Sequence, residues 1–245
     1  LLDELGRIPI PPYLIRESEE IDITRYQPVY ARYEGSVAAS TAGLHFSEEL
    51  MAEMRTKGFG FEGVTLHVGA GTFLPVKDEN AAEHPMHTEH FSVTLPTIEN
   101  LLQRADNIVA VGTTSVRTLE SLAALAWRIR CEGSPATERV VGQWELYDIP
   151  QEFSGREVLQ TIAEYMRKNG VEQLKAATQI MITPLGYRFR VVRYIITNFH
   201  QPKSTLLLLV GAYVGDDWHR IYDYALAHDF RFLSYGDSSL LKVAR

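Results

Sequence analysis

The sequence has one cysteine, Cys131, among 245 residues, so no disulfide can form within the chain. We therefore expect a reducing compartment and predict a cytoplasmic protein. No apolar run approaches the roughly 18 residues that a membrane-spanning helix requires. The first residues also lack the basic and apolar parts of a signal peptide. We therefore predict neither a disulfide-rich secreted protein nor a membrane protein.

Positive charge is in deficit as well. The chain carries 24 Lys and Arg against 31 Asp and Glu, a formal net charge of -7. Nucleic-acid binders usually have a basic surface, so this balance argues against RNA binding unless a local basic patch exists. A hydrophobic fraction of 45% and a charged fraction of 22% are typical of a globular protein. The length fits one large domain or two small ones.

Apolar runs of strand length alternate with helical patterns along the chain. The predicted strands are residues 61–68, 91–95, 107–112, 140–147, 179–183 and 188–197. The predicted helices are a short one after Ser47 and residues 98–105, 113–127, 154–169, 204–214 and 218–228. Ser47 and Ser154 are predicted N-caps. This alternation predicts an α/β fold, with a mainly parallel sheet flanked by helices.

Three predicted strands end in polar or glycine-rich junctions, where ligands bind in α/β folds. The first holds Gly69 and Gly71, whose backbone N–H groups could approach a ligand closely. It is not a complete G-x-G-x-x-G motif, because Leu74 stands where the third glycine would be. A plain tight turn is therefore an equal alternative.

The second junction leads into a helix that starts with Thr113, Thr114 and Ser115. Free N–H groups and hydroxyls at a helix start can bind a phosphate or a carboxylate. Arg117 and Glu120 follow three residues apart on one helical face. The alternative interpretation is a capped helix with a surface ion pair, although three hydroxyl residues exceed what one cap needs.

The third junction brings Asn198, His200 and Lys203 to the start of another helix, which Ser204 or Thr205 would cap. A histidine and a lysine at such a place can hold an anion or transfer a proton.

Histidines also cluster around residues 84–90. The spacing of His84, His87 and His90 suggests a metal site, but a zinc site needs three or four converging ligands. The chain has neither a His-Glu-x-x-His motif nor a cysteine pair, so no metal is predicted. His87 and Glu89 are better interpreted as an acid–base or hydrogen-bonding pair. For any single histidine a structural role is an equal alternative.

Taken in order, these segments resemble the S-adenosylmethionine:tRNA ribosyltransferase-isomerase family. The resemblance is carried by residues 9–13, 35–46, 64–73, 84–89, 111–121, 197–209 and 232–237, and it covers almost the whole chain. It implies residues 1–20 as a connector from a missing N-terminal and β-barrel part, and residues 21–245 as the large α/β catalytic domain. The absence of a starting methionine fits a chain that continues before Leu1 or has been trimmed there.

The resemblance implies transfer and isomerisation of the ribosyl part of S-adenosylmethionine onto 7-aminomethyl-7-deazaguanine at the tRNA wobble position. The products would be epoxyqueuosine in tRNA, adenine and methionine. Partners would be tRNA and S-adenosylmethionine, with no metal or redox cofactor and a monomeric protein. The sulfonium acidifies the ribose 5′ C–H, so a general base must remove that proton, and an acid must protonate the departing adenine.

On this resemblance, the pool that holds base and acid is His45, His67, His87, Glu89 and His200. The expected substrate-binding residues are Thr41, Gly43, Gly69, Gly71, Thr72, Thr113, Thr114, Ser115, Arg117, Asn198, Lys203, Tyr235 and Asp237.

The sequence departs from the family pattern at Ser40, at Gln201 and over residues 179–184. These departures bear on which acceptor the protein uses more than on the use of S-adenosylmethionine as the donor. Two alternatives therefore stay open: a paralogue that uses S-adenosylmethionine with another acceptor, and a non-catalytic nucleotide- or RNA-binding domain.

Overall fold

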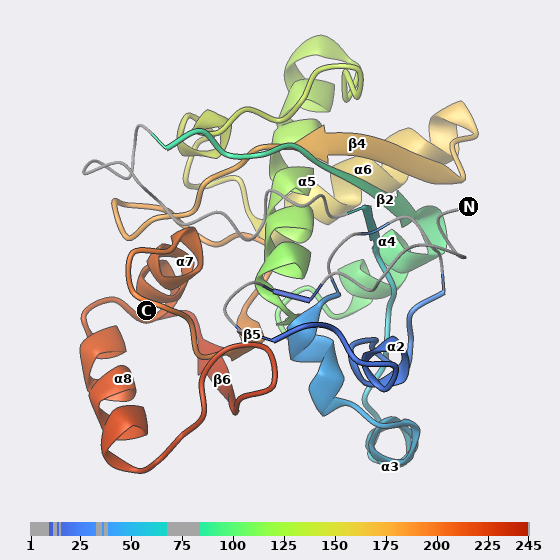
Figure 1. Ribbon diagram of the computed structural model, residues 1–245. Coiled ribbons are helices and arrows are strands. Elements are labelled where there is room, and N and C mark those ends of the chain that lie inside the picture. Colours follow the sequence, from blue (N-terminus) through green and yellow to red (C-terminus); the bar gives the residue numbers. More distant parts are fainter. Residues whose placement is uncertain are drawn as a thin grey trace.

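The structure is a computed structural model that describes residues 10–11, 14, 16–32, 36, 39–67 and 84–244. Within them the strands form two three-stranded sheets (Figure 1). One sheet has the order β1 (Thr65–His67), β2 (Glu89–Thr94) and β4 (Gln173–Thr178). The other has the order β3 (Val109–Val111), β5 (Tyr194–Asn198) and β6 (Ser238–Lys242).

The helices lie between and around these sheets. They are α2 (Asp22–Arg25), α3 (Glu48–Thr56), α4 (Leu95–Gln103), α5 (Thr113–Glu132), α6 (Gly155–Asn169), α7 (Thr205–Val214) and α8 (Asp217–Ala227), with short 3-10 helices η2 (Thr41–His45) and η5 (Glu145–Tyr147). The α/β class is thus confirmed. No helix among the described residues has the length and apolarity to cross a bilayer.

The prediction of a mainly parallel sheet is wrong for the described strands. Only β3 and β5 pair in parallel, whereas β1–β2, β2–β4 and β5–β6 are antiparallel. The reason lies in the connections. Helix α4 leads from β2 in one sheet to β3 in the other, and α5 and α6 lead back to β4. These helices join strands of different sheets, so they do not make neighbouring parallel strands.

Two predicted strands are also absent from the described sheets. Residues 140–147 contribute only an isolated bridge from Val141 to Thr178 and the short helix η5. Residues 179–183 follow β4 and belong to no sheet ladder. Their amides bond the preceding loop instead: the Gln179 N–H donates to the Val141 carbonyl, and the Met181 N–H to that of Gln143.

Helix α5 runs through the middle of the molecule and is buried along most of its length (Figure 1). Its apolar side chains Leu122 and Leu125 pack with Ile162 and Met166 of α6 in one core, and all four are fully buried. Burial of a large aliphatic side chain stabilises the fold by roughly 1.5–3 kcal/mol relative to exposure. This core therefore holds the start of α5 firmly in place.

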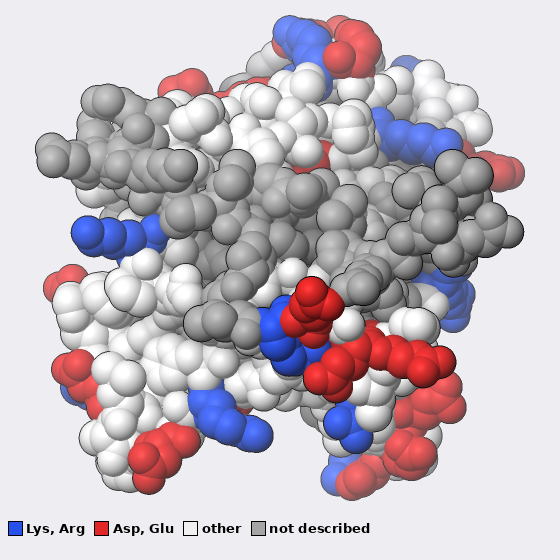
Figure 2. Space-filling view, in the orientation of Figure 1, with Lys and Arg blue, Asp and Glu red and all other residues white. Residues whose placement is uncertain are grey.

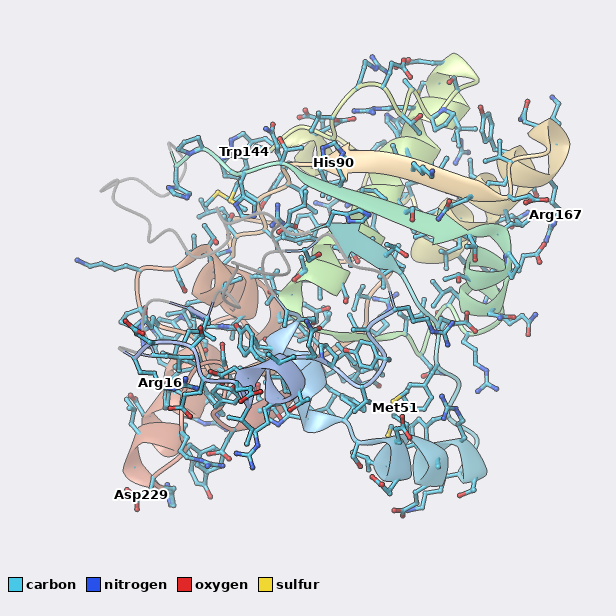
Figure 3. All side chains as sticks on the ribbon, turned by 45° about the vertical axis from the view of Figure 1, so that its right-hand side comes forward. Arg16, Met51, His90, Trp144, Arg167 and Asp229 are labelled. Atoms are coloured by element: carbon cyan, nitrogen blue, oxygen red, sulfur yellow. The ribbon has the colours of Figure 1, made fainter. Side chains whose placement is uncertain are left out.

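Serine caps fix where three helices begin. The Ser47 and Ser204 hydroxyls accept N–H bonds from Leu50 and Leu207, as the sequence predicts. Ser154 forms a full capping box with Glu157. Away from the core, Arg167 on α6 pairs with Glu99 on α4 at 2.7 Å, and Met51 is the buried residue of α3 (Figure 3).

Charge of the two signs is mixed on the face shown in Figure 2. Lysine and arginine side chains of the described residues stand singly or in small groups beside acidic ones, rather than in one broad basic area. A local basic patch, the condition set for RNA binding, is therefore not apparent among the described residues on this face.

Candidate functional site

The carboxyl ends of β3 and β5 meet at one edge of their sheet, because these strands are parallel. Gly112 follows β3 with a φ of +89°, and its N–H donates to the Ile196 carbonyl at 2.8 Å. Glycine is needed here for two reasons: the positive φ, and the Ser40 hydroxyl, which a Cβ would meet at 2.9 Å. The close approach brings η2 and the start of α5 to the same edge.

A buried ion cluster lies beside this edge. Glu89 is fully buried, and its Oε2 lies 2.9 Å from Nη1 of Arg117, while its Oε1 lies 2.9 Å from Nε2 of His87. The Arg117 Nε donates to the Ile180 carbonyl at 3.1 Å. Burial lowers the pKa of Arg117, and the Glu89 carboxylate opposes that shift. The cluster thus orients one nitrogen of His87 from inside the protein.

A layer of contacts behind this cluster holds residues 84–88. The Gln143 side chain accepts from the Met86 N–H at 3.1 Å and donates to the His84 carbonyl at 3.0 Å. The Gln179 amide donates to the Thr88 hydroxyl at 2.8 Å.

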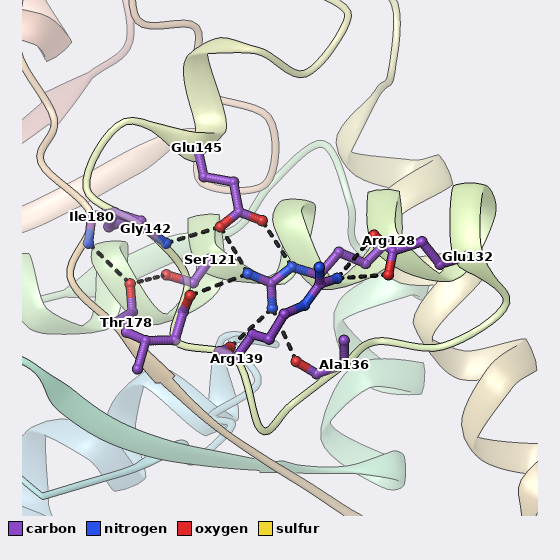
Figure 4. Close-up of polar contacts among 10 residues, drawn as sticks. Ser121, Arg128, Glu132, Ala136, Arg139, Gly142, Glu145, Thr178 and Ile180 are labelled. Atoms are coloured by element: carbon purple, nitrogen blue, oxygen red, sulfur yellow. Dashed lines mark hydrogen bonds and ion pairs between the residues drawn. The ribbon is translucent and has the colours of Figure 1, made fainter.

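The loop that carries Gln143 is itself anchored to α5. Arg128 makes two 2.8 Å contacts to Glu145 and donates to the carbonyls of Ala136 and Arg139 (Figure 4). Helix α5 therefore supports residues 84–89 in two ways, through the contact of Arg117 with Glu89 and through Arg128, which holds this loop.

A small cavity of about 20 Å³ opens between the ion cluster and α7, which is room for about one water molecule. Its polar lining comes from the ion cluster and from hydroxyls at the starts of α5 and α7, and its apolar lining from methionines and aliphatic side chains. The lining residues are Met86, His87, Glu89, Thr113, Thr114, Arg117, Ile180, Met181, Ile182, Thr205, Leu206 and Leu209.

A second cluster surrounds Asn198 at the end of β5. The Asn198 Nδ2 lies 3.2 Å from Nε2 of His45 and donates to the carbonyls of Leu233 and Ser234 at 2.8 and 3.3 Å. Asn198 is buried, and Leu233 has a φ of +70°, which is strained for a β-carbon-bearing residue. One amide thus joins η2, β5 and the 231–237 loop, and backbone strain of this kind concentrates at functional sites.

His200 and His45 are both set up to be neutral near pH 7. The His200 Nε2 lies 2.8 Å from the Thr197 hydroxyl, and burial lowers the pKa of His200 to about 4. Burial also lowers the pKa of His45, with Asp237 opposing the shift. A neutral imidazole can accept a proton, so either ring could serve as a base.

The low pKa of His200 predicts loss of stability in acid. The unfolded chain would bind a proton near pH 6.5, whereas the folded protein would bind it only near pH 4. Protonation therefore favours unfolding, and the free energy of unfolding should fall by up to about 3 kcal/mol between pH 6.5 and 4. Urea denaturation across this range should show the slope, and His200→Gln should flatten it. An unchanged slope in the variant would contradict the assignment.

Comparison with known proteins shows the family of this chain. Its residues 1–241 match the family described as queuosine biosynthesis protein. The chain belongs to this family. It is 41% identical to the S-adenosylmethionine:tRNA ribosyltransferase-isomerases of Burkholderia orbicola (strain MC0-3) and Herminiimonas arsenicoxydans over 98% of its own length. It spans 58% and 59% of their lengths, respectively.

Comparison with solved structures agrees with this family assignment. The S-adenosylmethionine tRNA ribosyltransferase of Thermotoga maritima matches with a TM-score of 0.50 and 30% identity. The match covers 81% of this chain and 50% of that one. The family resemblance inferred from the sequence is therefore confirmed.

The structure of this family member brings many of the predicted site residues together. Thr113, Thr114, Arg117, His87 and Glu89 line one cavity. Thr41 and His45 belong to η2, which packs on the edge between β3 and β5 beside Asn198 and His200.

Other predicted residues have different roles or places. His67 pairs in register with His90 of β2, and both are exposed, so His67 faces away from buried Glu89 on the opposite side of the sheet. The Ser115 hydroxyl bonds back to the Val111 carbonyl at 2.8 Å. Lys203 is exposed.

Three further residues serve local packing. A Cβ on Gly43 would collide with the Tyr30 hydroxyl, so this glycine allows Tyr30 to approach. Tyr235 donates to a carboxylate oxygen of Asp22 at 3.0 Å, and Asp237 accepts from the Arg231 N–H at 2.7 Å. The predicted residues Gly69, Gly71 and Thr72 lie outside the described residues.

The alternative of a surface ion pair between Arg117 and Glu120 is wrong, because both residues are buried and each has other partners. Glu120 accepts from the N–H groups of residues 190–192 and from the Tyr187 hydroxyl at 2.8–3.0 Å. Burial raises the pKa of Glu120, while these bonds lower it. Glu120 thus holds the chain entering β5.

The sequence interpretation missed the apolar half of the cavity, which comes from Met86, Met181 and Leu206. Met86 and Leu206 each lie within three residues of a predicted site residue, whereas Met181 lies near none, so its position carried no signal. It also missed Asp22, whose pKa the bidentate Arg16 contact holds well below its usual range. Among the described residues, no three His, Cys, Asp or Glu side chains gather as a metal site.

Proposed function

We propose that this protein transfers and isomerises the ribosyl moiety of S-adenosylmethionine onto 7-aminomethyl-7-deazaguanine at the tRNA wobble position. The products are epoxyqueuosine in tRNA, adenine and methionine. The identity of 41% to enzymes named for this transfer supports the proposal. We propose further that the enzyme is monomeric, needs no metal or redox cofactor, and acts in the cytoplasm, where its tRNA substrate is found.

The observation that carries the proposal is the His87–Glu89–Arg117 cluster beside the start of α5. A purely structural ion pair has no need of an imidazole at its outer end. Yet His87 keeps 26% of its side chain exposed, while Glu89 behind it is fully enclosed. An enclosed carboxylate that fixes one ring nitrogen orients the imidazole, as in other oriented catalytic histidines.

His87 is therefore our choice of general base, with Glu89 as the positioning residue. The base takes one hydrogen from the ribose 5′ carbon, and the electron pair left beside the sulfonium drives the loss of adenine. The departing adenine takes up a proton from solvent, and the acceptor amine attacks before methionine leaves. His67 is the weakest member of the pool, since it faces the other side of its sheet.

One assay tests the function. The full-length protein is incubated with S-adenosylmethionine and tRNA carrying the aminomethyl base, and adenine is measured by chromatography. We expect adenine release that depends on the tRNA. Donor binding without release would favour a paralogue with another acceptor. Failure to bind the donor at all would favour a non-catalytic binding domain.

A further inference from the structure

The cavity beside the ion cluster has two unlike walls. Its polar side holds Thr113, Thr114 and Arg117 at the start of α5. Its apolar side holds Met86, Met181 and Leu206. Such a cavity matches a ligand that has a polar head on a short apolar chain.

The polar side has unused hydrogen-bond donors. No side chain caps α5, and the first N–H groups of a helix have no partner within the helix. The Arg117 side chain is 7% exposed, and its Nη2 has no hydrogen-bond partner among the described residues. Its other nitrogens are engaged by Glu89 and by the Ile180 carbonyl. A buried guanidinium donor without a partner is costly unless a ligand completes it.

The charge of the cavity is balanced. Arg117 and the positive end of the α5 dipole attract an anion, whereas the Glu89 carboxylate lies 2.9 Å from Arg117. A site with both signs is better matched to an amino-acid zwitterion than to a simple anion. Its volume, about 20 Å³, admits only one small polar group such as a carboxylate, so the rest of the ligand must lie at the cavity mouth.

We propose that this cavity binds the amino-acid end of S-adenosylmethionine, with the carboxylate on the start of α5 and on Thr114 and Arg117. The methylene groups then lie along Met86 and Met181, and the sulfonium reaches the cavity mouth at His87. This inference rests on the proposed function and assigns one part of the donor to one part of the site. It places the acidified 5′ carbon beside the proposed base.

A phosphate of the tRNA backbone fits this cavity poorly. A phosphodiester is bonded on two sides to sugars, so it is too bulky to enter a recess of this volume. Half of the lining is apolar, which would remove water from the charged group without replacing its hydrogen bonds. From the sequence, Thr113, Thr114 and Arg117 could bind either the donor's polar groups or an RNA phosphate. The shape and lining of the cavity favour the donor.

The test compares S-adenosylmethionine with its decarboxylated form, which keeps the ammonium and sulfonium groups. Dissociation constants are measured by calorimetry on the full-length protein. We expect the wild type to bind the decarboxylated form about 10–100-fold more weakly, the loss expected when hydrogen bonds to a charged group disappear. Equal dissociation constants would overturn the proposal.

The variant Thr114→Val removes one hydroxyl at nearly constant volume and leaves the Glu89–Arg117 pair intact. It should raise the dissociation constant of S-adenosylmethionine by about 10-fold and that of the decarboxylated form little. The ratio of the two dissociation constants therefore shrinks. The matched control Thr56→Val, on the distant helix α3, should leave the ratio unchanged. An unchanged ratio in Thr114→Val would also overturn the assignment of Thr114.

The two hypotheses fail separately. If adenine release occurs but the carboxylate makes no difference to binding, the site assignment is wrong and the function stands. If the carboxylate contributes through Thr114 but no adenine appears with tRNA, the binding site stands and the proposed transfer is wrong.

Discussion

Replacing His87 by alanine should lower kcat for adenine release by about 10²–10⁴-fold, the usual contribution of a positioned general base. The melting temperature should change little, because the His87 side chain is partly exposed and Glu89 keeps its contact with Arg117. The measurement is single-turnover adenine release at saturating donor and tRNA. Saturation separates loss of the chemical step from loss of binding.

His90 offers the matched control for this experiment. It lies on the same strand as Glu89, is exposed, and faces the opposite side of the sheet. His90→Ala should keep kcat within about 2-fold of the wild type, in the normal range for a surface substitution. A wild-type rate in His87→Ala would move the role of base to His45 or His200.

Replacing Arg117 by methionine should lower the free energy of unfolding by about 3–5 kcal/mol, because it leaves the Glu89 carboxylate buried without its guanidinium. Chemical denaturation of the full-length protein measures the loss. Adding Glu89→Gln should recover part of it, since the amide carries no charge to bury. A single variant within about 1 kcal/mol of the wild type would show that the pair is not a structural requirement.

Arg167 supplies the contrast for that comparison. Its ion pair with Glu99 is also short, 2.7 Å against 2.9 Å for Arg117 and Glu89, but its side chain is 53% exposed. Exposed pairs contribute about 0–1 kcal/mol, so Arg167→Met should have a small effect. The difference between the two variants would isolate burial as the cause.

The helices were the most predictable part of this fold. Ser47, Ser154 and Ser204 each precede an apolar pattern of helical spacing, and each caps a helix as expected. These signals are local, so the sequence carries them directly. Sheet partners are not local, and alternation of strands and helices does not reveal that α4 crosses between two sheets.

The site shows the same division. The hydroxyls at the start of α5 and the polar end of β5 could be predicted, because each follows an apolar run of strand length in the sequence. The pairing of Arg117 with Glu89 could not, because the two lie on different elements and the nearer Glu120 was the simpler partner. Glu120 instead bonds the amides of residues 190–192, which only the packed chain brings within reach.

The central claim is that His87 removes a hydrogen from the ribose 5′ carbon of the donor. It can be tested most directly with S-adenosylmethionine that carries two deuterium atoms on that carbon. With tRNA present, the wild type should pass one deuterium to water as each adenine is released. In His87→Ala this transfer should be at least about 100-fold slower. Loss of deuterium at the wild-type rate in His87→Ala would contradict the account.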